Sequence, residues 1–143
     1  MKKTLPALAA LVIITFVVSC NKNPHIPVPD NEIVANWKLD STVYLKYFDS
    51  ILVQQERKYF FSDRLNLGSD NTYRYTHMDS VLSFGKYIYY DTDKQLVFSD
   101  GYTTTEASVK MLTNNTLNYV VSNRHPDPDS SMLREEKWYY YTK

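Results

Sequence analysis

The sequence is short of cysteine, glycine and net charge. Its 143 residues include one cysteine, three glycines, and 16 basic residues against 16 acidic ones. One cysteine cannot form a disulfide within the chain, so a packed core must stabilise any folded domain. A balanced charge gives no support to nucleic-acid binding, which needs a basic surface. The composition therefore favours a domain held together by apolar burial.

The longest apolar run lies at the N-terminus. Lys2 and Lys3 precede it, residues 7–18 carry no charge, and Ser19 and Cys20 close it. A basic start and a short hydrophobic stretch are typical of a secretory signal peptide. The run is shorter than the roughly 20 residues of a spanning helix, which argues against an uncleaved anchor. Ordinary secretion would leave an unpaired thiol in an oxidising compartment, which argues against a simple secreted protein.

The segment Val17 to Cys20 resembles the lipobox of bacterial lipoproteins, in which the chain is cut before an acylated cysteine. The resemblance implies a signal peptide over residues 1–19 and lipidation of Cys20, for example by palmitate, with membrane lipid as the partner. Residues 20–31 contain three prolines and predict an extended tether. We expect a lipid-anchored protein of the cell envelope, at the outer membrane, with the leaflet left open.

Residues 32–143 have the composition of a β domain. All 13 tyrosines lie here, and aromatic and β-branched residues favour strands. From Trp37 to Tyr47, alternation predicts that Trp37, Leu39, Val43, Leu45 and Tyr47 share one face. No segment has helical periodicity. The expected strands cover residues 37–48, 58–67, 72–77, 86–90, 95–99, 103–111, 117–121 and 133–142.

About eight short strands joined in sequence by polar turns predict an all-β fold. An up-and-down antiparallel barrel is the first interpretation, and a sandwich is the alternative. An eight-stranded barrel is either filled by side chains or holds one small ligand. Closure also removes the exposed edges that endanger an aromatic-rich sheet. We expect one domain over residues 32–143.

The order of these features resembles the lipocalin-like domain lipoproteins of Gram-negative bacteria. A lipobox and tether are followed by an early tryptophan strand, Ala35 to Leu39, and then by hairpins around the polar turns 68–71, 91–94 and 113–115. The resemblance covers residues 33–143. It implies a lipocalin-like barrel in which Trp37 is structural and packs across the closed end. It also implies that the barrel carries a small hydrophobic molecule.

Strand alternation also suggests which side chains line a cavity. Their hydroxyl and imidazole groups would orient a partly apolar ligand. The alternative, that the same side chains only fill the core or cover the surface, stays open. The candidates are Tyr73, Tyr75, His77, Tyr87 and Tyr89.

A second cluster offers metal ligands at a spacing of two. His125, Asp127 and Asp129 lie in a loop that contains prolines, and such a run can hold calcium or zinc weakly. Its ligands are too few for a known metal-binding loop, so an ordinary solvated turn is the favoured interpretation. We predict no metal and no cofactor.

The sequence offers little for catalysis. Cys20 is committed to lipid, no Gly-x-Ser-x-Gly motif occurs, and Glu135 and Glu136 point to opposite faces of a strand. We therefore expect a protein that is not an enzyme. The first hypothesis is a membrane-anchored barrel that binds a small hydrophobic ligand. The alternative is a filled barrel that docks an envelope protein through Tyr139 and Tyr141.

Overall fold

The computed structural model describes residues 32–126 and 132–143, and within them it contains nine β-strands and no helix. The expected signal peptide, the expected tether and Cys20 lie outside the described residues. The strands are β1 (Ala35–Phe48), β2 (Ile51–Tyr59), β3 (Asp63–Leu67), β4 (Thr72–His77), β5 (Ser80–Tyr90), β6 (Gln95–Ser99), β7 (Thr104–Leu112), β8 (Thr116–Pro126) and β9 (Met132–Thr142).

The strands form one antiparallel sheet that closes on itself. The order is β2-β1-β3-β4-β5-β6-β7-β8-β9, and β1 also pairs with β9. Eight strands, β1 and β3 to β9, therefore make a closed barrel, and β2 is an additional strand on β1. This confirms the prediction of an all-β, eight-stranded antiparallel barrel.

The turn between β4 and β5 places two residues other than glycine at positive φ. Met78 and Asp79 both have positive φ, 46° and 66°, and connect β4 to β5 directly. A two-residue hairpin with positive φ at both positions matches the right-handed twist of its strands. From β3 to β8, successive strands are antiparallel, so their turns alternate between the two ends of the barrel.

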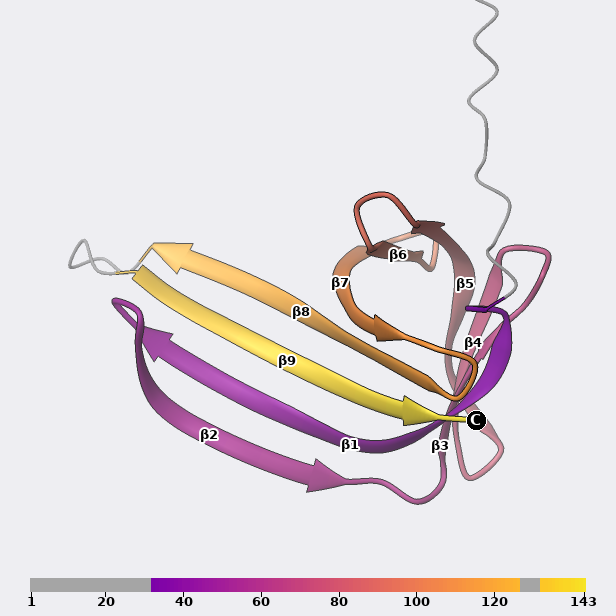
Figure 1. The fold of residues 1–143 in the computed structure, drawn as a ribbon, viewed down its shortest axis with the longest axis horizontal. Helices are drawn as coiled ribbons and strands as arrows, with labels where there is room; N and C mark the ends of the chain where they lie inside the picture. The colour runs from indigo at the N-terminus through magenta and orange to yellow at the C-terminus, as the bar shows by residue number, and fades with distance from the viewer. Residues whose placement is uncertain (1–31, 127–131) are drawn as a thin grey trace, which may run out of the picture.

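Four strands extend well beyond the rest. Figure 1 shows β8, β9, β1 and β2 as long strands lying side by side, and the pairings give the same order. The strand expected over residues 58–67, with a break at Ser62 and Asp63, is divided between two strands that both pair with β1: β2 ends at Tyr59 and β3 begins at Asp63, so the break lies slightly earlier than expected. Every residue of β2 is exposed, so its side chains show no alternation of burial.

A bulge in β1 corrects the predicted face of this strand. Against β9, Leu39 pairs with Tyr141 but Ser41 pairs with Tyr140, so Asp40 is the extra residue. An extra residue reverses which side chains face inward. Trp37 and Leu39 belong to the core. Beyond the bulge, Val43, Leu45 and Tyr47 lie on the opposite face, which contradicts the single shared face expected from alternation.

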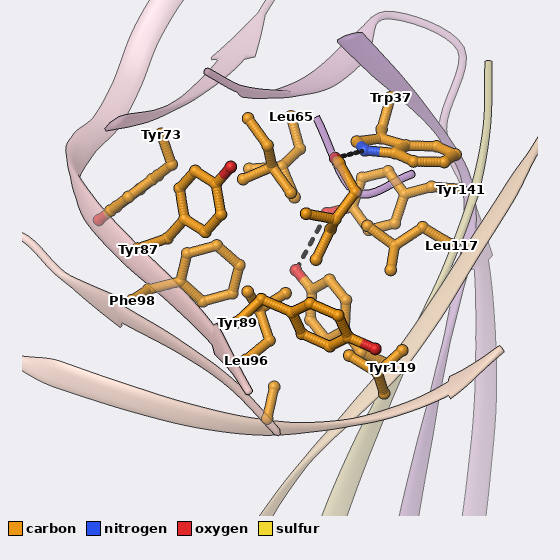
Figure 2. Packing of buried hydrophobic residues seen from close by; sticks show 14 of the residues in the cluster. Trp37, Leu65, Tyr73, Tyr87, Tyr89, Leu96, Phe98, Leu117, Tyr119 and Tyr141 are labelled. Atoms are coloured by element: carbon orange, nitrogen blue, oxygen red, sulfur yellow. Dashed lines mark hydrogen bonds between the residues drawn. The ribbon is translucent and has the colours of Figure 1, made fainter. Parts of the chain in front are cut away.

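The core lies inside the barrel and is rich in aromatic rings (Figure 2). Trp37 has no exposed surface, its indole Nε1 donates to the Ile33 carbonyl at 2.9 Å, and Lys143 Nζ lies 4.7 Å from the centre of its ring. The N-terminal and C-terminal segments of the domain therefore both contact this side chain. The other fully buried large side chains are Tyr87, Tyr141, Ile33, Leu39, Leu67, Leu96 and Leu117.

Candidate functional site

The barrel is not filled completely. A cavity of about 240 Å³ remains, and side chains from β3 to β9 line it. It is widely open to solvent, and the exposed side chains of its lining are Thr105 and Lys137. The interior of the barrel is therefore filled by side chains in one part and open to solvent in the other. The lining residues are Leu65, Tyr73, Tyr75, Ser83, Phe98, Thr105, Tyr119, Lys137, Tyr139 and Tyr141.

Aromatic rings make most of the apolar wall. Tyr119 stacks on Tyr139 with ring centroids 4.8 Å apart and an interplanar angle of 27°. Tyr73 meets Phe98 edge to face at 5.1 Å. Offset stacking and edge contacts are the favoured geometries of aromatic pairs. The rings therefore support one another and present a firm surface to a small molecule.

Polar groups occupy a few positions in this wall. The hydroxyls of Tyr73 and Ser83 lie 2.9 Å apart, and those of Tyr119 and Tyr141 lie 3.2 Å apart. Lys137 Nζ lies 5.1 Å from the centre of the Tyr139 ring. An apolar wall with a small number of placed polar groups is the usual composition of a small-molecule site.

A buried carboxylate, Asp63, is hydrogen-bonded both to a cavity side chain and to a side chain at the surface. Asp63 is 4% exposed, and its two oxygens accept hydrogen bonds from the hydroxyl of Tyr75 and the Nδ1 atom of His77, the latter at 2.5 Å. The ring of Tyr75 lines the cavity, whereas the half-exposed side chain of His77 does not. Burial, together with the hydrogen bond to Asp63, raises the pKa of Tyr75. Asp63 therefore fixes the position of one cavity tyrosine.

The candidate residues from the sequence separate into three groups. Tyr73 and Tyr75 line the cavity. Tyr87 and Tyr89 point into the filled core, where the hydroxyl of Tyr87 donates to the Gly68 carbonyl at 2.9 Å and that of Tyr89 donates to an Asp91 carboxylate oxygen at 3.3 Å. His77 lies outside the lining and bonds to Asp63.

Three cavity residues on β8 and β9 were not among the candidates from the sequence: Tyr119, Lys137 and Tyr139. Both strands were expected, and the alternation of side chains along each strand could have identified these residues as facing inward. The docking surface assigned to Tyr139 and Tyr141 is wrong, because Tyr141 is fully buried and Tyr139 is half-buried in the barrel. Tyr139 and Tyr141 therefore belong to the inward face of β9, whereas docking would require them to face solvent.

The candidate metal ligands His125, Asp127 and Asp129 are only partly described by the structure. His125 lies exposed at the end of β8, and Asp127 and Asp129 fall outside the described residues. Among residues 32–126 and 132–143, no three His, Cys, Asp or Glu side chains gather closely enough to hold a metal ion. Over the same ranges, no helix is long and apolar enough to cross a bilayer.

Buried tyrosines predict a loss of stability at high pH. Burial raises the pKa of Tyr87 to about 12, and also raises the pKa of Tyr119 and Tyr141. Above about pH 10, tyrosines of the unfolded chain lose protons that the folded chain retains. Stability is therefore complete below about pH 10 and falls as the pH rises toward the folded pKa values. We expect the urea midpoint to be lower at about pH 11 than at about pH 8, and equal midpoints would contradict this account.

Comparison with known proteins adds no identification. No family model matches the chain, and neither the curated proteins nor the solved structures give a significant match.

Proposed function

We propose that the chain is a lipid-anchored protein of the bacterial cell envelope whose barrel binds a small, partly apolar molecule. The observation that carries the proposal is the cavity of about 240 Å³ lined by stacked aromatic rings. Sites for drug-sized ligands measure roughly 300–1,000 Å³. We therefore expect a smaller ligand, with a single ring system or a short chain.

The lining indicates the orientation of this ligand. Its apolar part would lie against the rings of Tyr119, Tyr139 and Phe98, which form one continuous wall. Its polar end would lie toward the solvent opening at Lys137, because an exposed ammonium group needs little further desolvation to pair with an acceptor. A ligand with a polar or anionic end suits this arrangement. The proposal contains no catalytic step.

A substitution at the cavity wall tests binding. Thr105 lines the cavity, and its neighbour Thr104 points to the opposite face of β7. We expect Thr105→Trp to fill the cavity, and Thr104→Trp to add the same ring outside it. In native mass spectrometry of the full chain extracted from membranes, the unaltered protein and Thr104→Trp should retain a bound small molecule, and Thr105→Trp should lose it.

Two results would contradict ligand binding in this cavity. One is the absence of any adduct on the unaltered protein. The other is an adduct that persists equally in both variants.

The anchor is tested separately. Cys20 is the single cysteine of the chain, so no other thiol could carry an acyl group. We expect metabolic palmitate labelling of the unaltered protein and of His25→Ala, a change in the tether that leaves the lipobox intact. Cys20→Ala should carry no label. Label on Cys20→Ala would show that the lipobox interpretation is wrong.

A further inference from the structure

The outer wall of the barrel at β3, β4 and β5 has an unusual charge. The outward positions of these three strands include Arg64, Arg74 and Lys86 and no carboxylate. Lys38, on β1, pairs directly with Arg64. Without Lys2 and Lys3, the rest of the chain has 14 basic residues against 16 acidic ones, so this wall is positive on a chain that is slightly negative. We call these four side chains the basic wall.

Neither arginine of the basic wall, Arg64 or Arg74, forms an ion pair with a carboxylate of the described residues. Both line a hollow of about 640 Å³ on the outside of the barrel, together with Asp70 and Asp79 from the adjoining turns. Asp70 is held by the backbone N–H and the hydroxyl of Thr72, at 3.1 and 2.6 Å. The guanidinium groups are thus available to an external anion.

Apolar side chains lie directly beside these cations. Phe84 pairs with Arg74, and Val81 pairs with Thr76, across β4 and β5. Phe84 and Met78 are each 69% exposed, and Leu82 is 60% exposed. Met78 lies at the tip of the hairpin, where the backbone N–H donates to the Ser62 carbonyl. An exposed apolar hairpin therefore projects next to an exposed cationic wall.

We propose that the β4–β5 hairpin and the basic wall dock onto an anionic lipid bilayer. Guanidinium groups bind phosphate oxygens through paired N–H donors, and the phosphate plane of a bilayer lies directly above hydrocarbon. In this orientation Met78, Leu82 and Phe84 enter the acyl boundary while Arg64 and Arg74 remain at the head groups. The proposal does not depend on a ligand in the barrel or on a lipid at Cys20.

A fluorescent label on the hairpin tests this contact. Residues 1–19 include an apolar run that can bring the full chain to any vesicle, so the readout is the position of a label and not total binding. The full chain carrying Cys20→Ala receives one cysteine, either by Met78→Cys or by Asn114→Cys. Asn114 is exposed in the turn between β7 and β8, at the opposite end of the barrel. An environment-sensitive dye is attached to that cysteine.

The expected result depends on lipid charge. With vesicles of equal phosphatidylglycerol and phosphatidylcholine, the dye at Met78→Cys shifts to the blue and brightens. With phosphatidylcholine alone it changes little, and the dye at Asn114→Cys responds to neither. Adding Arg64→Gln and Arg74→Gln raises the lipid concentration at half-response by about thirtyfold. The matched control, Lys58→Gln with Lys110→Gln, removes the same charge from exposed positions on β2 and β7 and leaves that concentration unchanged.

Three results would overturn the proposal. The first is a dye at Met78→Cys that stays in water while the chain sediments with anionic vesicles. This is the result expected if the basic wall binds an acidic protein and not a bilayer. The dye at Asn114→Cys could respond equally. The two arginine substitutions could have no more effect than the two lysine substitutions.

Discussion

Trp37→Ala lowers the free energy of unfolding by about 4 kcal/mol, close to the full cost of removing a buried aromatic side chain. The indole is completely buried, donates to the Ile33 carbonyl and lies against Lys143, so its removal leaves a cavity and an unpaired carbonyl group. Urea denaturation measures the change. This is a large fraction of the roughly 5–15 kcal/mol that stabilises a typical domain.

Trp138→Ala is the matched control for this substitution. Trp138 lies on the outer face of β9, is only partly buried, and donates to Glu136 at 3.0 Å. We expect a loss of about 1–2 kcal/mol, because a partly exposed side chain leaves a smaller cavity. If Trp37→Ala does not fold, Trp37→Phe should still fold with a smaller loss. Equal losses for the two tryptophans would contradict the central position of Trp37 in the core.

Gly85→Ala has the second large effect, about 3 kcal/mol of stability. A Cβ atom at Gly85 would lie 2.0 Å from the Ser99 carbonyl oxygen and 2.9 Å from Asp100 Cα, and both are backbone atoms of the neighbouring segment. Backbone in a hydrogen-bonded ladder cannot move aside as a side chain does. The absence of a side chain at Gly85 lets the end of β6 approach β5 closely.

Gly68→Ala controls for the general cost of replacing glycine. Its added Cβ would meet the side-chain atoms of Asp70 and Thr72, at 2.6 and 3.0 Å, and these can rotate away. We expect a loss of about 1 kcal/mol in the same urea experiment. A Gly85→Ala protein as stable as Gly68→Ala would show that β5 and β6 do not approach so closely.

The middle of the barrel is predictable from sequence because its hairpins are regular. Alternation along residues 86–90 and 95–99 places Tyr87, Tyr89, Leu96 and Phe98 on one face, and all four are buried in the core. The polar turn 91–94 sets the register between these two strands, and an alternating pattern then determines which side chains face inward. Local sequence is sufficient for this pair because its register contains no bulge.

Bulges are where alternation fails. Alternation along residues 103–111 places Ala107, Val109 and Met111 on one face. Ala107 and Val109 are buried, but Met111 is half exposed, because the register between β7 and β8 shifts between Val109 and Met111. Asp40 has the same effect in β1. A bulge depends on the partner strand, and for β1 that partner is about a hundred residues away in the sequence. No local pattern contains this information.

The position of the cavity depends on how the sheet closes into a barrel. Tyr73 and Tyr87 both point inward, yet only Tyr73 lines the cavity, which it shares with Tyr119 of β8 and Tyr139 of β9. Sequence alternation separates inside from outside. It does not separate the filled part of the interior from the hollow part, which follows from strand tilt and stagger.

The most direct test of the account is a crystal structure of the protein purified from its native cells without removal of bound molecules. We predict electron density for a non-protein molecule in the cavity, in contact with the rings of Tyr73, Tyr119 and Tyr139. A cavity that contains only ordered water, or one closed by these rings, would contradict a ligand-binding barrel.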